Sequence, residues 1–151
     1  MTQVKTEGGG VLCPVRGGKR SGKTVARAIE LALAEAAPLI FLYIVDVEFL
    51  GHATVARVKL MVDELIETGS FALEILADKA RAAGVTEVES VIREGGIKTV
   101  IGEVIAERGA SVLVTGRPGQ TPGVVSFSEN EFDTFLKDLS AESGVRVERV
   151  E

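Results

Sequence analysis

The sequence contains no tryptophan, and cysteine and histidine occur only once each, as Cys13 and His52. A single cysteine excludes an intrachain disulfide, and without an accompanying histidine we expect Cys13 to be an inert core thiol rather than a nucleophile. His52 has no Cys, Asp or second His at ligand spacing, so we expect a surface residue and no metal site. No Ser-His-Asp or paired-carboxylate arrangement can be recognised. The sequence therefore predicts no catalytic residues.

Long hydrophobic runs and a surplus of positive charge are also missing. The longest apolar stretch, residues 38–45, is too short to span a bilayer and is followed by Asp46. The N-terminus lacks the apolar segment of a signal peptide. A net charge of −5 gives no general attraction to nucleic acid or to an anionic membrane. We therefore expect a cytoplasmic protein with neither a nucleic-acid nor a membrane partner.

Aromatic residues are scarce, at 5% of the chain, whereas hydrophobic residues make up 46% and glycine occurs 17 times. A core of Val, Ile, Leu and Ala is typical of a parallel sheet covered by alanine-rich helices. With 151 residues, the chain is expected to form one domain over 10–151, preceded by a flexible tail over 1–9.

Hydrophobic periodicity predicts strands and helices in alternation. The expected strands are Val11–Val15, Leu39–Val45, Val85–Arg93, Ala110–Thr115 and Val145–Glu151. The expected helices are Ser21–Ala36, a long helix with its apolar face from Val58 to Ala80 that bends near Gly69 and ends at Gly84, then Ile97–Arg108 capped by Gly109, and Phe127–Ala141. This order predicts right-handed crossovers, and hence an α/β fold with a single open, mostly parallel five-stranded sheet and helices on both faces.

Ligands of such sheets bind at the carboxyl ends of the strands, near the point where the strand order reverses. The loops after the first and fourth strands are rich in Gly, Arg and Lys, and they supply these candidate binding residues: Arg16, Gly17, Gly18, Lys19, Lys23, Gly116, Arg117 and Gly119. In a chain of negative net charge, this concentration favours an anion site built from glycine amides, a helix N-terminus and basic side chains. The alternative is a solvated basic surface loop.

Residues 17–24, Gly-Gly-Lys-Arg-Ser-Gly-Lys-Thr, also fit the phosphate-loop pattern G-x-x-x-x-G-K-[ST] between a strand and a helix. In a phosphate-loop ATPase or kinase, Lys23 would hold the β- and γ-phosphates, Thr24 would bind Mg²⁺, and Asp46 would complete the metal site. A chance match within another fold is the competing interpretation.

The whole chain resembles the universal stress protein family over roughly residues 10–150. Four segments carry the resemblance: Val11-Leu-Cys-Pro-Val-Arg-Gly-Gly, Ile40-Phe-Leu-Tyr-Ile-Val-Asp46, Val91-Ile-Arg-Glu-Gly95 and Gly109-Ala-Ser-Val-Leu-Val-Thr-Gly-Arg-Pro-Gly119. The resemblance implies strand order 3-2-1-4-5, a fold like that of adenine-nucleotide hydrolases, and a binding or signalling role in stress tolerance without established catalysis.

Some members of that family bind ATP, and the resemblance implies a related but altered site here. Gly116 and Gly119 match the family's Gly-x-x-Gly, but Arg16 stands where binding members carry an acidic residue, and Glu129-Asn130 stands where they carry Gly-Ser or Gly-Thr. Ser126 is the nearest substitute for that serine, and Val45 at the end of the second strand is a further candidate. The expected cofactor is ATP or another phosphate-bearing ligand, with Mg²⁺ present only alongside a nucleotide.

The resemblance further implies a homodimer that pairs through the last strand, residues 145–150. The charged residues of this strand, Arg146, Glu148 and Arg149, could then meet their symmetry mates across a two-fold axis. Alternatively, these charges protect an exposed sheet edge from aggregation. A third hypothesis is an interaction module that contacts a protein partner and holds no small ligand.

Overall fold

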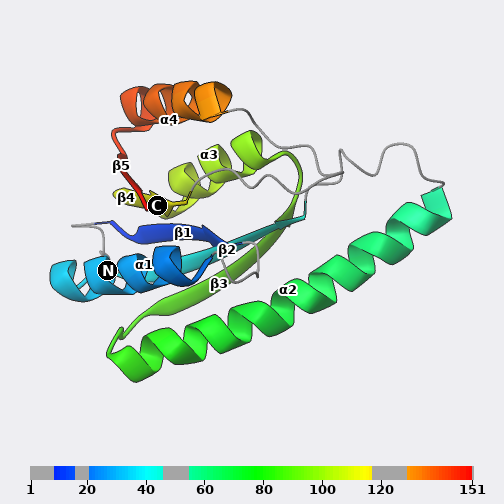
Figure 1. Cartoon of the computed structure of the whole chain (residues 1–151), viewed down its shortest axis with the longest axis horizontal. Coiled ribbons are helices and arrows are strands. Elements are labelled where there is room, and N and C mark those ends of the chain that lie inside the picture. Colours follow the sequence, from blue (N-terminus) through cyan, green and yellow to red (C-terminus); the bar gives the residue numbers. More distant parts are fainter. Residues whose placement is uncertain (1–8, 16–20, 46–54, 117–128, 151) are drawn as a thin grey trace.

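A computed structural model describes residues 9–15, 21–45, 55–116 and 129–150. This part of the chain alternates five strands with four helices (Figure 1). In order they are β1 (Val11–Val15), α1 (Ser21–Glu35), β2 (Leu39–Val45), α2 (Val55–Ala83), β3 (Val88–Glu94), α3 (Ile97–Arg108), β4 (Val112–Thr115), α4 (Glu129–Ser143) and β5 (Arg146–Arg149). The predicted alternation is confirmed.

The strands form one sheet in the order β3-β2-β1-β4-β5, which confirms the expected 3-2-1-4-5. Every described pairing is parallel. Strand β1 occupies the centre, where Val11 lies opposite Leu39 of β2 on one side and Val112 of β4 on the other. The order of the strands reverses at β1, so the switch point lies between β1 and β4.

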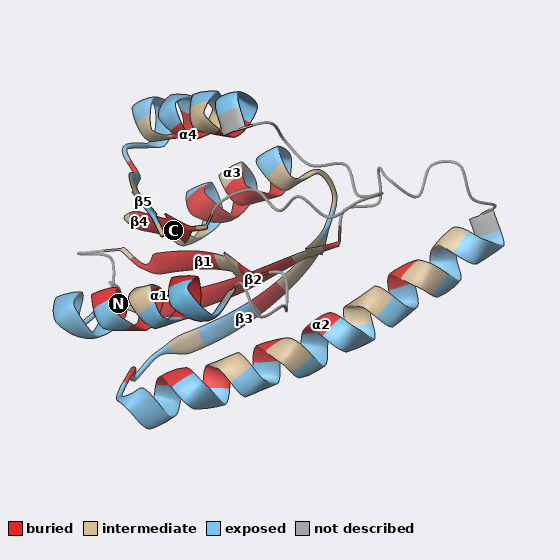
Figure 2. Ribbon diagram, in the orientation of Figure 1, coloured by how far each residue is buried: buried red, intermediate tan, exposed pale blue. Residues whose placement is uncertain are grey.

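Each face of the sheet carries its own apolar core, because successive side chains of a strand point to opposite faces. Helices α1 and α2 cover the face that holds Val11 and Cys13, whereas α3 and α4 cover the face that holds Leu12 (Figure 1). The three central strands are almost wholly buried (Figure 2). The near-continuous apolar sequence of β2 follows from this two-sided burial.

The helices end in residues with left-handed backbone conformation. Gly84, Gly109 and Gly144 have φ values of 113°, 63° and 77°, and Ala36 takes the same place after α1 with φ 51°. After α2, Val85 N–H donates to Ala80 O and Gly84 N–H donates to Arg81 O, which is the Schellman arrangement. Strand β3 therefore begins at Val88 rather than at the expected Val85, since Val85 belongs to the helix end.

Helix α2 runs without interruption through Gly69, where a bend was expected. A Cβ atom built on Gly69 would lie 2.3 Å from Cδ2 of Tyr43. The glycine therefore lets the Tyr43 ring of β2 pack against the helix backbone. Although α2 has 29 residues, no helix in the described part of the chain is long and apolar enough to cross a membrane.

Ion pairs fasten both edge strands to neighbouring helices. On β3, Arg93 holds Glu107 of α3 through two hydrogen bonds of 3.0 and 2.7 Å, and Glu89 accepts two from Arg108 at 3.0 and 2.8 Å. The β5 pairs are Arg146 with Glu35 and Glu148 with Arg27, both from α1, and Arg149 with Asp133 of α4. The charges of β5 thus have partners within one chain.

Candidate functional site

The carboxyl ends of β1 and β4 meet the N-terminus of α1. The first turn of α1 contains no acidic residue, and Lys23 is exposed there. Acidic side chains are the ones that a helix N-terminus stabilises, because the helix dipole places partial positive charge there. A lysine at this place forgoes that stabilisation and adds to the positive potential, so the end of α1 is suited to an anion.

Thr24 joins α1 to the end of β4. Its side chain is only 5% exposed, and a Cβ atom on Gly116 would lie 3.0 Å from Thr24 Oγ1. Within the described residues this hydroxyl has no hydrogen-bond partner, which is uncommon for a buried polar group. A side chain at position 116 would crowd it. Glycine therefore keeps the backbone after β4 open toward the end of α1.

The end of β4 is held in place from two sides. Thr115 is 8% exposed, and its hydroxyl donates to Gly116 O at 3.2 Å. Val150 N–H donates to Thr115 O at 2.8 Å. These bonds fix the direction in which the chain leaves the sheet. These two hydrogen bonds hold Gly116 in its position opposite α1.

Val45 is the remaining candidate within the described residues, and Gly22 belongs to the phosphate-loop pattern. Gly22, in the first turn of α1, has no described atom within 4 Å of a Cβ built on it. Val45 is 1% exposed, and its carbonyl oxygen accepts a hydrogen bond of 3.0 Å from Gly95 N–H. Contact of the Val45 side chain with a ligand is therefore blocked by burial.

Of the predicted site, the structure brings the helix that carries Lys23 together with Gly116. Seven candidates lie outside the described residues: Arg16, Gly17, Gly18, Lys19, Arg117, Gly119 and Ser126. Asp46 and His52 lie outside them as well. The sequence missed the Thr24–Gly116 contact, for which it offers no signal, because the two residues come close only once β1 and β4 pair.

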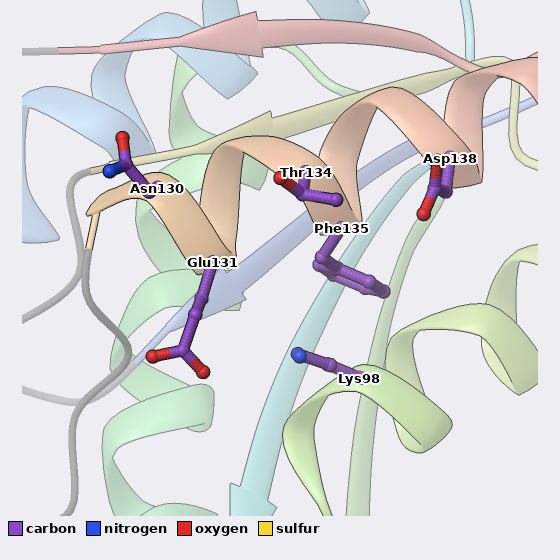
Figure 3. Close-up of a pocket in the computed structure, with 6 residues that line it drawn as sticks. All are labelled: Lys98, Asn130, Glu131, Thr134, Phe135 and Asp138. Carbon is purple, nitrogen blue, oxygen red and sulfur yellow. The ribbon is translucent and has the colours of Figure 1, made fainter.

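A hollow of about 390 Å³ opens between α3 and α4. Lys98 comes from α3, and Figure 3 shows the Phe135 ring pointing from α4 toward that helix. The other lining residues, all on α4, are Asn130, Glu131, Thr134 and Asp138. Charges of both signs are mixed around a half-buried ring, so the lining matches no single class of ligand.

Cys13 is a core thiol, as predicted. It is fully buried in β1, and burial raises its pKa from 9.0 to about 12. The thiolate needed for nucleophilic chemistry is therefore not formed at neutral pH. Among the described residues, no group of three or more His, Cys, Asp or Glu side chains is arranged to hold a metal ion.

Comparison with known proteins points in one direction. The sequence model of the universal stress protein family matches residues 10–125. No curated protein matches the sequence. Among solved structures, the universal stress protein UspA from Lactobacillus plantarum is 16% identical with a TM-score of 0.76, over 97% of this chain and 100% of that one.

Two further structures of this kind are described as nucleotide complexes. A universal stress protein in complex with cAMP is 22% identical with a TM-score of 0.65, over 96% of this chain and 99% of that one. The universal stress protein from Archaeoglobus fulgidus in complex with dAMP is 16% identical with a TM-score of 0.63, over 94% of this chain and 97% of that one. At these identities the structures establish the fold, and the family model establishes the membership. The chain belongs to the universal stress protein family.

Proposed function

We propose that this chain is a cytoplasmic binding and signalling protein that holds a phosphate-bearing ligand, an adenine nucleotide in the first instance, and does not turn it over. The observation that carries the proposal is the exposed Lys23 on the N-terminal turn of α1, which Thr24 joins to Gly116 at the end of β4. Phosphate oxygens would approach the amides of α1 and the bare backbone after β4.

The related structures with cAMP and dAMP support a nucleotide as ligand. Two departures of the sequence argue for an altered site: Arg16 replaces an acidic residue, and Glu129-Asn130 replaces Gly-Ser or Gly-Thr. A guanidinium suits a phosphate or a carboxylate better than a sugar hydroxyl. We therefore expect phosphate contacts to contribute more to affinity than nucleoside contacts.

The phosphate-loop alternative requires the Thr24 hydroxyl to coordinate Mg²⁺. Magnesium sites usually keep several water molecules around the ion. Thr24 is only 5% exposed, and a Cβ atom on Gly116 would lie 3.0 Å from its hydroxyl oxygen. This packing favours a structural role for Thr24 and a binding rather than an ATPase function for the loop.

We further propose a homodimer paired through β5. Arg146, Glu148 and Arg149 are already paired with Glu35, Arg27 and Asp133 of the same chain. Ion pairs exchanged between the subunits would therefore not hold such a dimer together. Backbone pairing along the free edge of β5 would have to do so, with the charges limiting unwanted association.

The test of ligand binding is a thermal-melt titration with MgATP, cAMP and inorganic phosphate. Ligand at one hundred times its Kd adds about 2.7 kcal/mol to the unfolding free energy, or several degrees in Tm for a chain of this size. We expect Lys23→Ala and Gly119→Ala to weaken binding roughly tenfold. Lys137→Ala, which removes an exposed lysine from α4, should leave it unchanged. If no ligand moves the Tm of the wild type, the proposal is wrong.

Two variants separate binding from phosphate-loop catalysis. Gly22→Ala places its Cβ more than 4 Å from every described atom that the glycine does not adjoin, and Thr24→Val replaces the hydroxyl by a methyl group of similar size. In a binding protein both variants should fold and retain ligand within about threefold of the wild-type Kd, a difference of under 1 kcal/mol. Sustained phosphate release from MgATP by the wild type, abolished by both changes, would establish the ATPase instead.

A further inference from the structure

Three large apolar side chains stand on the outer side of α2. Leu60, Phe71 and Ile75 are 63%, 67% and 54% exposed, and the only other exposed large hydrophobic residue in the described part of the chain is Leu33 of α1. At about 100° per residue, Phe71 and Ile75 project within about 60° of Leu60, and Gly69 projects to the opposite side. We call these three residues the α2 ridge.

The α2 ridge is not needed to hold α2 on the sheet. The inner side of the helix is buried through Val62, Leu73, Ala77 and Ala80. Figure 2 shows the side of α2 that faces away from the sheet as mostly exposed along its length. Phe71 and Ile75 are neighbours one turn apart, so they form a continuous apolar surface. Single exposed apolar residues are ordinary, whereas a contiguous group of them marks an interaction site.

Negative charge predominates around Phe71, while the basic residues Arg57 and Lys79 lie one turn beyond Leu60 and Ile75. Residues 60–78 contain no Lys or Arg but five acidic residues. Asp63 and Asp78 pair with Lys59 and Arg81 at 3.6 and 3.5 Å. The three between them, Glu64, Glu67 and Glu74, are exposed and form no ion pair with any described residue. Glu67 and Glu74 lie one turn on either side of Phe71.

We propose that the α2 ridge docks a basic amphipathic helix of a partner protein. The apolar stripe of that helix would cover Phe71 and Ile75, and its Lys or Arg residues would meet Glu64, Glu67 and Glu74. Two copies of this chain packed antiparallel, ridge to ridge about Phe71, would bring Glu67 and Glu74 of one copy close to the same residues of the other. Anionic membranes and nucleic acids are repelled by the same carboxylates. This surface is independent of the proposed ligand site at the end of α1.

The test is selection from a display library of amphipathic helical peptides. The apolar stripe is fixed, and the flanking positions are drawn from Lys, Arg, Glu, Gln and Ser. Wild-type protein is the bait, after binders to Phe71→Ala/Ile75→Ala have been removed. We expect Lys and Arg to be enriched at the flanking positions. No enrichment, or enrichment of acidic or neutral flanks, would overturn the proposal.

Titration of the most enriched peptide then locates its site. We expect Phe71→Ala/Ile75→Ala to weaken binding at least about tenfold, and Leu33→Ala, which removes an exposed apolar residue from α1, to leave it unchanged. Glu67→Gln/Glu74→Gln should weaken binding in low salt and match the wild type in about 0.5 M salt, where charges are screened. The matched charge control is Glu103→Gln/Glu142→Gln. Equal affinity for all variants would overturn the proposal.

Two further measurements address the other occupants. Sedimentation equilibrium would identify a second copy if the wild type associates and Phe71→Ala/Ile75→Ala does not. Flotation with phosphatidylcholine or phosphatidylserine vesicles would identify a lipid surface if the same substitutions abolish it. Either result would overturn the proposal in favour of that occupant.

Discussion

Two glycines inside helices illustrate how one residue type serves different ends. A Cβ on Gly69 would lie 2.3 Å from the Tyr43 ring, whereas a Cβ on Gly102 in α3 has no described atom within 4 Å. We expect Gly69→Ala to destabilise the protein by about 2 kcal/mol or more, because the ring must move in a packed core. Gly102→Ala should stabilise it by about 1 kcal/mol through helix propensity. Urea unfolding of both variants measures these opposite signs.

The cause of the Gly69 effect can be isolated by removing the ring. In a Tyr43→Ala background, Gly69→Ala should cost much less, since the atom that it meets is gone, and the two changes should be strongly non-additive. Equal costs in both backgrounds would show that the helix, not the ring, requires the glycine.

Ala36 occupies a backbone conformation that disfavours side chains. Ala36 has a φ of 51° and directly follows α1, at the position where the other helices end in glycine. The left-handed conformation costs an L-residue about 1–2 kcal/mol. Ala36 is exposed, so burial of its methyl group adds little stability. Glycine loses more conformational entropy on folding than alanine does, and this offsets part of the gain. We therefore expect Ala36→Gly to raise the unfolding free energy by up to about 1 kcal/mol. Urea unfolding that shows a loss of stability would contradict this.

At the scale of the element, the sequence predicted the positions of the helices better than the boundaries between the helices and the strands that follow them. Leu39–Val45 and Ile97–Arg108 have their predicted bounds, because Pro38 and Gly109 mark them. Strand β3 starts later than predicted, since Val85 is an apolar residue that completes a helix end and looks in sequence like the first residue of a strand. Alanine has a high helix propensity, so the left-handed conformation of Ala36 could not be predicted from the sequence.

The Arg93–Glu107 pair gives the edge strand β3 a dependence on pH. The hydrogen bonds from Arg93 lower the pKa of the Glu107 carboxyl. A carboxyl whose pKa is lower in the folded state contributes stability above its unfolded pKa of about 4.3 and loses it as the pH falls through the folded value. Glu107→Gln should therefore be less stable than the wild type at pH 7, and the difference should vanish at strongly acidic pH.

Urea unfolding between pH 7 and pH 2.5 measures this dependence. Glu142→Gln changes an exposed carboxyl on α4 and serves as the control. If Glu107→Gln and Glu142→Gln lose the same stability at every pH, the pair contributes nothing particular to the edge strand.

At the scale of the whole molecule, the site shows what a sequence can and cannot convey. The position of the candidate site follows from the sequence, because alternation of strands and helices fixes which loops face the carboxyl edge of the sheet. Lys23 and Gly116 were identifiable from the composition of those loops. The Thr24–Gly116 contact was not, since it depends on how far α1 leans over β4. The α2 ridge was hidden in the same way, because its spacing gains meaning only once the other side of α2 is known to be buried.

The single thiol reports on unfolding of the whole domain. Cys13 is fully buried in the central strand, and burial raises its pKa to about 12. We expect a thiol reagent at pH 8 to react only with molecules that have opened globally, so that the labelling rate rises with urea in proportion to the unfolded fraction. The protonated Cys13 thiol makes its full contribution to stability below pH 9 and loses that contribution as the pH rises toward 12. Fast labelling in the absence of urea would reveal a local opening of β1 instead.

The central position of β1 also has a consequence for synthesis on the ribosome. Val11 is synthesised about 100 residues before Val112, its neighbour on one side in the sheet. Until β4 arrives, the nascent chain carries an apolar strand with one side unpaired, and such edges pair readily with other chains. The partly synthesised sheet, rather than the complete protein, is therefore the form that is most prone to association with other chains in the cell.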